Sequence, residues 1–336
     1  MKLPCSLRRL FVLAGLTAFV MAGALAASSA ALAQGASTKP VNLMVPYPAG
    51  GPSDAIARIL NTPLGQQLGQ MVLVENLGGV AGALAAQKVL AAPADGQYLF
   101  QGSPNEVILS PLANAAVRLK AEDFRLVHPV ADAVMVFVTR KDLGVNSVDE
   151  LIALARKSAD RPLSYGSVGQ GSLYHLILEQ AQAQTGIKLS HVPYRGNAPL
   201  LQDIAGGQVD FAVLVYSAGM GALAEQGRLK VIGQLGAQRS ELLKNLPTAS
   251  EGKELKNFAF KIWTGLMVPK ATPEAVVQRL HAAIGKTLQD PAVRSQLAAQ
   301  TQLASAPMSL AESAAFFEAE TARYRAIARQ INLQPQ

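Results

Sequence analysis

The chain has 336 residues, half of them hydrophobic, and a formal net charge of +7 at neutral pH. This length predicts two domains with ample hydrophobic cores. The single cysteine, Cys5, excludes an internal disulfide and a metal site built from several thiolates, and the mild positive charge argues against nucleic-acid binding.

The first 33 residues have the pattern of a cleaved signal peptide. An uncharged run from 10 to 27 follows a basic start, and Ala31-Leu32-Ala33 matches a small-residue cleavage site. We expect export to the periplasm, with Gln34 as the mature N-terminus and the net charge lowered by three, to +4. The alternative is a retained membrane anchor. The Arg8-Arg9 pair leaves open whether export uses the general or the twin-arginine route.

Residues 41–60 predict a strand, a glycine turn and a helix in direct succession. The apolar run 41–45 is typical of a strand covered on both faces, and Gly50-Gly51 leaves main-chain N–H groups accessible to a ligand. Ser53 or Asp54 can cap the helix that follows. The helix start then forms an anion-binding arrangement, although the segment lacks the lysine of a nucleotide-binding P-loop. The alternative is a proline-rich turn that only connects two elements.

The next segments repeat the same alternation. We predict strands at 71–74 and 98–101 and a helix at 83–92 between them, followed by a long strand at 133–139. This β-α-β-α-β order predicts a parallel sheet with helices on both faces.

A second alternating unit begins after residue 140. Its predicted strands lie at 163–165, 188–193, 209–216 and 229–235, and its predicted helices lie at 148–157, 173–184 and from 198 onward. A strand at 262–268 then leads into helices at 275–288, 291–300 and 309–330, which we expect to return to the first unit. The apolar face of the last helix, Leu310, Ala314, Phe317 and Tyr324, is expected to belong to the core.

Loops at the carboxyl ends of parallel strands line the ligand crevice of open α/β sheets. In both units these loops should gather around one cleft: 47–54, 103–105, 167–172, 195–197 and 216–217. Two of them are rich in glycine and open helices. A carboxylate held between two such helix starts would receive hydrogen bonds from both sides.

The motifs together resemble a known family. In chain order they are PYPAGGPSDAIAR from Pro46, VEN from Val74, GGVAGALAAQKV from Gly78, PADGQYLF from Pro93, YGSVGQGSLYH from Tyr165, PYRGNAPLLQDIAGGQVDFAV from Pro193, LPTASEG from Leu246 and WTGLMVPKATPEAVVQRLHAAI from Trp263. This series is similar to the conserved segments of the Bug receptors. These receptors are the periplasmic solute-binding components of tripartite tricarboxylate transporters, and the resemblance covers residues 40–330.

The resemblance implies an α/β protein with two doubly wound lobes and a central cleft, the type II periplasmic-binding-protein fold. Residues 40–138 and 262–336 would form the first lobe and 139–261 the second. The family binds small organic acids through main-chain N–H groups, hydroxyls and water, without a cofactor or a metal. We expect a monomer that delivers its ligand to the membrane permease components of the transporter.

Twelve residues are the predicted ligand contacts. The resemblance assigns nine of them to the two glycine-rich loops, and the strand-end rule adds Ser103, Asn197 and Tyr216. The nine are Tyr47, Ala49, Gly51, Ser53, Asp54, Ser167, Gly169, Gly171 and Ser172. The Asp54 carboxylate would repel a ligand carboxylate, so we interpret it as a cap that holds water. Whether Asp54 or His175 contacts the ligand directly stays open.

The residues are also compatible, to different degrees, with other functions. A receptor that presents its ligand to a two-component sensor kinase has the same sequence features. A periplasmic serine hydrolase is a weaker alternative, because Tyr165 replaces the first glycine of the nucleophile elbow around Ser167. Gly219 to Ala224 nearly matches a dinucleotide fingerprint but comes late in its unit. The four histidines lack metal-binding spacing.

We therefore predict a receptor without enzymatic activity. Its two lobes would close over the ligand by a hinge motion near Arg140 and Trp263, where the chain is expected to cross between them. The residues that would recognise the far end of the ligand have no local sequence signature, so the identity of the carboxylate is not predicted.

Overall fold

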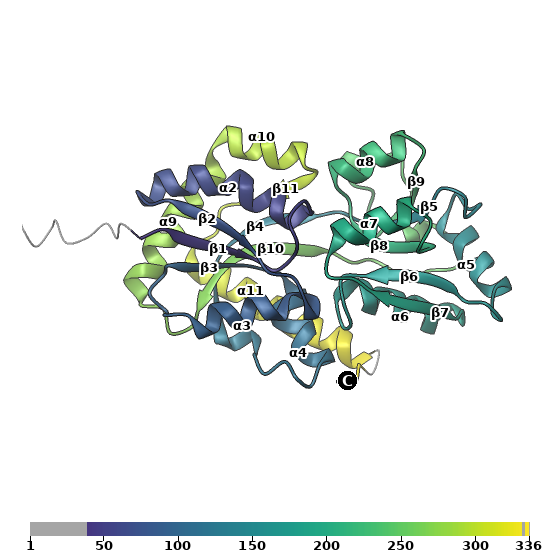
Figure 1. The fold of residues 1–336 in the computed structure, drawn as a ribbon, viewed down its shortest axis with the longest axis horizontal. Helices are drawn as coiled ribbons and strands as arrows, with labels where there is room; N and C mark the ends of the chain where they lie inside the picture. Colours follow the sequence, from purple (N-terminus) through teal and green to yellow (C-terminus); the bar gives the residue numbers. More distant parts are fainter. Residues whose placement is uncertain (1–38, 331–332, 336) are drawn as a thin grey trace, which may run out of the picture. The chain divides into compact units, whose positions relative to one another are not determined.

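The chain is described by a computed structural model that covers residues 39–330 and 333–335 (Figure 1). The predicted signal peptide, with Cys5, lies outside these residues. Residues 40–336 form one compact unit. Over the described range, no helix has both the length and the apolar character that a membrane span requires.

The first sheet has six strands in the order β11-β4-β10-β3-β1-β2. The strands are β1 (Val41–Val45), β2 (Val72–Asn76), β3 (Tyr98–Gly102), β4 (Phe124–Ala133), β10 (Ile262–Pro269) and β11 (Gln302–Ala304). Strand β1 pairs in parallel with β2 and β3, whereas β10 is antiparallel to β3 and β4, and β11 is antiparallel to β4. The three strands of the predicted β-α-β-α-β unit, β1, β2 and β3, pair in parallel as expected, whereas the later strands β4, β10 and β11 add antiparallel pairs to the same sheet.

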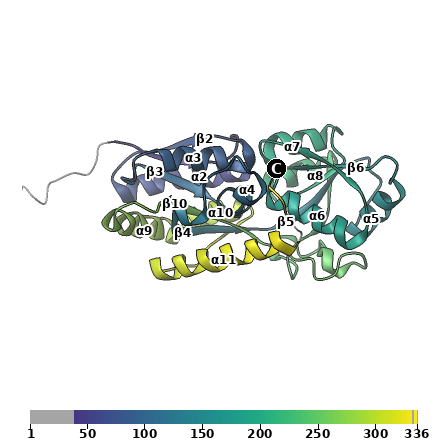
Figure 2. The same ribbon diagram turned by 90° about the horizontal axis from the view of Figure 1, so that it is seen from below.

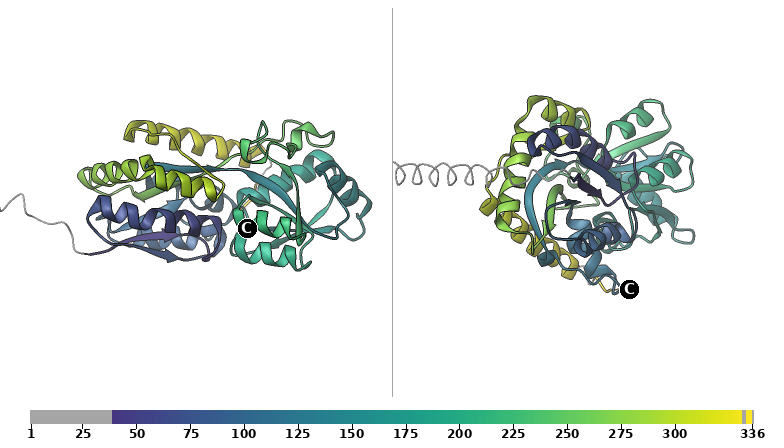
Figure 3. Two further views of the ribbon diagram at one scale, coloured as in Figure 1. Left: turned by 90° about the horizontal axis from the view of Figure 1, so that it is seen from above. Right: turned by 60° about the vertical axis from the view of Figure 1, so that its left-hand side comes forward.

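Helices cover both faces of the first sheet. They are α2 (Pro52–Leu68), α3 (Ala83–Ala91), α4 (Ser110–Ala113), α9 (Glu274–Gln289), α10 (Pro291–Ala299) and α11 (Leu310–Gln330), with short turns η1 (Val80–Gly82), η2 (Asn105–Leu109) and η3 (Ala121–Asp123). In Figure 3 the yellow-green helices α9 and α10 lie beside the purple α2, and Figure 2 shows α11 alongside β4. Leu43 packs with α2 and α9, and Met44 packs with α3, which explains the unbroken apolar run of β1.

The second sheet has five strands in the order β7-β6-β8-β5-β9. They are β5 (Met135–Arg140), β6 (Leu163–Ser167), β7 (Leu189–Pro193), β8 (Phe211–Val215) and β9 (Leu229–Gln234), accompanied by α5 (Val148–Lys157), α6 (Leu173–Thr185), α7 (Asn197–Ala205), α8 (Ala218–Glu225), η4 (Glu241–Leu243) and η5 (Ala249–Glu251). Strand β6 pairs in parallel with β7 and β8, while β5 runs antiparallel to β8 and β9.

The chain passes from the first sheet to the second at Val134, between β4 and β5. The predicted domain change between 138 and 139 falls inside β5, so strand pairing favours a boundary at Val134. Arg140 lies at the far end of β5, where its Nε donates to Asp210 Oδ1 at 2.8 Å, and therefore not at a crossover as predicted. Trp263 does lie next to the return crossing, and its indole N–H donates to Glu320 Oε2 of α11 at 3.0 Å.

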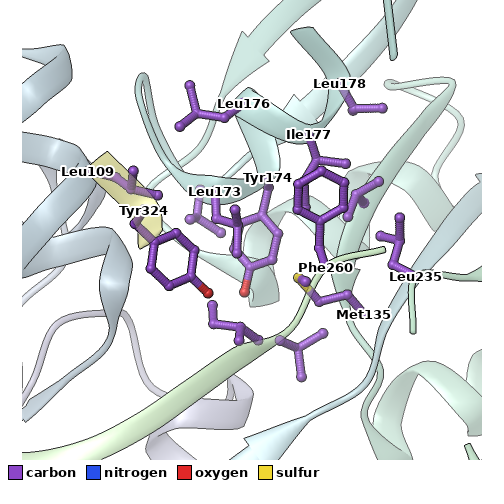
Figure 4. Packing of buried hydrophobic residues seen from close by; sticks show 14 of the residues in the cluster. Leu109, Met135, Leu173, Tyr174, Leu176, Ile177, Leu178, Leu235, Phe260 and Tyr324 are labelled. Atoms are coloured by element: carbon purple, nitrogen blue, oxygen red, sulfur yellow. The ribbon is translucent and has the colours of Figure 1, made fainter. Parts of the chain in front are cut away.

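One hydrophobic cluster contains residues of both sheets. Figure 4 shows Leu173 and Tyr174 of α6 packed near Leu109 of η2 and Tyr324 of α11. The predicted core face of α11 is only partly buried, because Phe317 and Tyr324 belong to this cluster whereas Leu310 is half-buried and Ala314 is exposed.

Candidate functional site

A small cavity opens between the two sheets at the carboxyl ends of β1 and β3. It has a volume of about 40 Å³, enough for a few water molecules. Residues of the first sheet supply most of its wall: Tyr47, Gly51, Ser53, Gln101, Ser103, Asn105 and Glu106. The second sheet and its helices contribute Tyr174, Asn197 and Val215. We call this space the first cavity.

A second cavity, of about 100 Å³, adjoins the first. The two share Gly51, Pro52, Asn197 and Val215, so these residues form the neck between them. Ser217 also borders the second cavity. A ligand too large for one cavity can therefore extend into the other past the start of α2.

Helix α2 begins at this neck. Its N-cap is Gly51, and no side chain among the described residues caps the helix. The prediction that Ser53 or Asp54 provides the cap was wrong. Asp54 is the third residue of the helix, and its Oδ2 accepts Gly50 N–H and Arg58 Nε–H, both at 2.9 Å. Burial opposes the effect, but these two hydrogen bonds hold the pKa of Asp54 below its ordinary value.

Helix α7 begins at the same neck from the second sheet. Its N-cap is Gly196, again without a capping side chain in the described part of the chain. A Cβ on Gly196 would lie 2.8 Å from Pro48 Cδ, and a Cβ on Gly78 would lie 2.9 Å from the same atom. Both glycines therefore allow the β1–α2 loop to sit close to the start of α7. Two helix N-termini, one from each sheet, border the cavities.

The predicted second ligand loop, at the start of α6, does not line either cavity within the described structure. Gly169 N–H donates to Ser167 Oγ at 3.1 Å, and Gly171 N–H donates to His175 Nδ1 at 3.1 Å. Leu173 N–H donates across the sheets to Asn105 Oδ1 at 2.8 Å. These donors already have protein partners in this conformation.

The glycines of that loop permit contact between the sheets. A Cβ on Gly169 would lie 2.9 Å from Ala81 N, and one on Gly171 would lie 1.8 Å from Ala113 Cβ. Both glycines have positive φ, +134° and +73°. Their small size is thus required where the α6 loop packs on η1 and α4.

The structure brings five of the twelve predicted contacts together around the first cavity: Tyr47, Gly51, Ser53, Ser103 and Asn197. Seven lie outside the lining of both described cavities: Ala49, Asp54, Ser167, Gly169, Gly171, Ser172 and Tyr216. Ser172 caps α6 by accepting His175 N–H at 3.4 Å. The Tyr216 carbonyl accepts the Thr301 hydroxyl at 2.8 Å.

Glu106 is a cavity residue that the sequence reasoning missed. It is fully buried, its Oε1 accepts the Tyr47 hydroxyl at 2.5 Å, and its Oε2 accepts Ser103 N–H at 2.5 Å. Asn105 Nδ2 in turn donates to the Tyr47 hydroxyl at 3.2 Å. Burial raises the pKa of Glu106 to about 7, and burial together with the Glu106 charge raises the pKa of Tyr47. An acid within the apolar segment after β3 is the signal that could have identified it.

The charge balance of the first cavity is unusual for an anion site. Among the described residues that line it, Glu106 is the one carboxylate, and there is no Lys, Arg or His. An anion in this space would be held by main-chain N–H groups and neutral side chains, because helix N-termini carry partial positive charge.

Two histidines, the buried His175 of α6 and the half-buried His191 of β7, form a stacked pair away from the cavities. The rings of His175 and His191 stack with centroids 4.3 Å apart, and His191 Nε2 lies 2.7 Å from Ser167 Oγ. Ser167 is fully buried, which leaves no path for a substrate to its hydroxyl in this conformation. Burial lowers the pKa of both histidines to about 4.

Replacing His191 with glutamine should reduce the loss of folding stability that occurs when the pH is lowered. An unfolded histidine takes up a proton below about pH 6.5, whereas the folded His191 does so only near pH 4, so folding stability falls as the pH drops between these values. The wild type should lose about 2 kcal/mol more than the variant between pH 7 and pH 4.5. Urea unfolding at both pH values measures this difference. Parallel losses in the two proteins would contradict the assignment.

The sequence of the chain matches a known family. Residues 56–333 match the sequence profile of the tripartite tricarboxylate transporter family receptor. The chain belongs to this family. It is 32% identical over 300 residues to a protein encoded in the tcbD-tcbE intergenic region of Pseudomonas sp. strain P51, with 88% of this chain and 87% of that protein covered.

Solved structures of similar receptors share the fold. The Rhodopseudomonas palustris protein Rpa4515, solved with adipate, is 29% identical with a TM-score of 0.82, over 90% of this chain and all of that chain. MatC of the same organism, solved with bound malate, is 25% identical with a TM-score of 0.79, over 86% and 98% of the two chains. The predicted family and the two-lobed α/β fold are thus confirmed for this receptor.

Proposed function

We propose that this receptor binds a small carboxylate in the periplasm, between the N-termini of α2 and α7, and delivers it to a tripartite transporter. The observation that carries the proposal is the pair of uncapped helix starts, one from each sheet, at the neck of the two cavities. Each helix N-terminus carries roughly half a positive charge and has main-chain donors without helical partners.

The geometry fits a carboxylate because its two oxygens need donors from two sides. Gly51 and Ser53 belong to the start of α2, and Asn197 is the first residue of α7. In the proposal these three residues hold the carboxylate, and the Tyr47 and Ser103 side chains lie next to it. Asp54 does not contact the ligand in this proposal. Its carboxylate accepts the Gly50 N–H and so fixes the loop just before the helix start.

Related receptors support the choice of ligand class, since adipate and malate are both small carboxylates. The membrane permease components of the transporter are the proposed partners, and recognition of the closed form would let them distinguish loaded from empty receptor. The proposal assigns no catalytic role to the Ser167–His191 pair.

Calorimetric titration of the purified receptor against a broad panel of mono-, di- and tricarboxylates tests the proposal. At least one acid should bind with a dissociation constant in the micromolar range or lower, and a Gly196→Ala variant should bind it at least about tenfold more weakly, because the new Cβ pushes Pro48 away from the neck. Gly285→Ala, on α9 and outside both cavities with no atom within 4 Å of the added Cβ, is the matched control. Absence of binding across the panel would overturn the proposed function.

A further inference from the structure

Gln101 lines the first cavity and has a side-chain amide whose orientation is fixed. It lies on β3, its side chain is 1% exposed, and it lines the cavity. Its Nε2 donates to the Ser53 main-chain oxygen at 2.8 Å. Because only the nitrogen of the amide can donate to a carbonyl, this bond fixes which end of the amide is Oε1.

The Oε1 atom of Gln101 has no hydrogen-bond partner among the described residues. Gln101 Oε1 is one of five buried side-chain atoms without a hydrogen-bond partner in the described structure. Of these five, it alone belongs to a residue that lines the first cavity. Leaving a buried acceptor without a donor is unfavourable, so such a group in a binding cavity points to a donor supplied from outside the protein.

Four other residues of the first cavity, Tyr47, Ser103, Asn105 and Glu106, have polar groups that are already paired. The Tyr47 hydroxyl and Ser103 N–H donate to the two oxygens of Glu106, and Asn105 uses its amide nitrogen and oxygen on Tyr47 and Leu173. These groups are therefore less able to accept a new donor than Gln101 is. The Glu106 carboxyl also disfavours a second ligand carboxylate in this part of the cavity.

The bond to Ser53 places Gln101 beside the first turn of α2. The nitrogen and oxygen of one amide are about 2 Å apart by covalent geometry, so the open acceptor lies close to the helix start that holds the carboxylate in the proposed function. A donor that reaches it must be near the carboxylate within the ligand.

We propose that Gln101 makes this receptor selective for 2-hydroxycarboxylates: its Oε1 accepts the ligand hydroxyl while the adjacent carboxylate lies at the starts of α2 and α7. This inference rests on the proposed function and adds the class of acid. A ligand that lacks the hydroxyl leaves Gln101 Oε1 buried and unpaired, and sites built around such a bond discriminate strongly against the analogue that lacks it.

Three pairs of acids that differ by one hydroxyl test this selectivity: lactate and propionate, malate and succinate, and mandelate and phenylacetate. In calorimetric titrations the wild type should bind the hydroxy acid of at least one pair about tenfold or more tightly than its partner. Gln101→Leu keeps the size of the side chain but removes the acceptor. The two dissociation constants of each pair should then differ by about twofold or less. Gln101→Met serves the same purpose if the leucine variant does not fold.

Gln70→Leu is the matched control, because Gln70 is also a buried glutamine but lies outside both cavities. It should keep the wild-type ratio. Equal binding of both members of every pair that binds, or the same loss of selectivity in Gln70→Leu, would overturn the assignment to Gln101 while leaving the carboxylate receptor intact. Failure of every acid in the broad panel would overturn the proposed function itself, and this inference with it.

Discussion

Replacing Glu106 with glutamine should make carboxylate binding independent of pH between 6 and 8. In the wild type, burial raises the pKa of Glu106 to about 7, so its carboxyl is mostly neutral at pH 6 and mostly charged at pH 8. The ligand carboxylate is ionised at both values. Repulsion between the two anions should therefore weaken wild-type binding by about tenfold between pH 6 and pH 8.

The measurement is a series of calorimetric titrations with the tightest-binding acid at pH 6, 7 and 8. The glutamine variant should bind at pH 8 about as tightly as the wild type does at pH 6. Glu318→Gln makes the same chemical change at an exposed position of α11 and should retain the wild-type profile. The same slope in wild type and Glu106→Gln would show that another group is responsible.

Alanine at Gly171 should lower the free energy of unfolding by about 3 kcal/mol. Two effects add there: a φ of +73°, which costs about 1 kcal/mol for a residue with a Cβ, and a Cβ only 1.8 Å from Ala113 Cβ, which costs about 2 kcal/mol through overpacking. The Ala113 methyl is fixed to the backbone and cannot rotate away. This contact joins the α6 loop to α4. The loss in the free energy of unfolding therefore reports how much the packing between the two sheets contributes to stability.

Gly144→Ala separates the two effects. Gly144 has a similar φ of +78° but no atom within 4 Å of the added Cβ, so this variant should lose only about 1 kcal/mol. Adding Ala113→Gly to Gly171→Ala removes the opposing methyl and should recover part of the stability. Denaturant unfolding of the four proteins gives these values, and equal losses for the two single alanine variants would contradict the packing argument.

Local sequence patterns predicted most elements within one or two residues. The helix Val148–Lys157 was predicted with its observed bounds, because Ser147 caps it and its apolar residues recur at helical spacing. Strand β4 was missed from 124 to 132. Pro129 argues against a central strand, yet here it pairs with Gly265 beside a bulge, where the regular ladder is already interrupted.

The direction of a strand within its sheet could not be predicted from local sequence patterns. Whether β10 runs parallel or antiparallel to β3 depends on where the chain crosses between the sheets, at Val134 and before Ile262, and not on the residues of β10. The same is true of β11, whose three residues form a strand only because they pair with β4.

The sequence predicted one side of the candidate site better than the other. The start of α2 and Asn197 at the start of α7 were both expected at the cleft and line the first cavity, whereas the α6 loop, expected as the second carboxylate loop, lines neither described cavity. Ser172 provides a side-chain cap for α6, whereas the Gly196 N-cap of α7 provides none. A helix start without Ser, Thr, Asp or Asn at its N-cap keeps more donors for a ligand, and this distinction was readable in the sequence.

Trp263 offers an internal fluorescent reporter for the receptor. It is the chain's only tryptophan, it is buried beside the return crossing between the sheets, and its ring contacts Phe316 and Phe317 of α11. If the proposed closure rotates the chain at that crossing, the surroundings of this single indole change, and its emission would follow loading of the unlabelled receptor in real time.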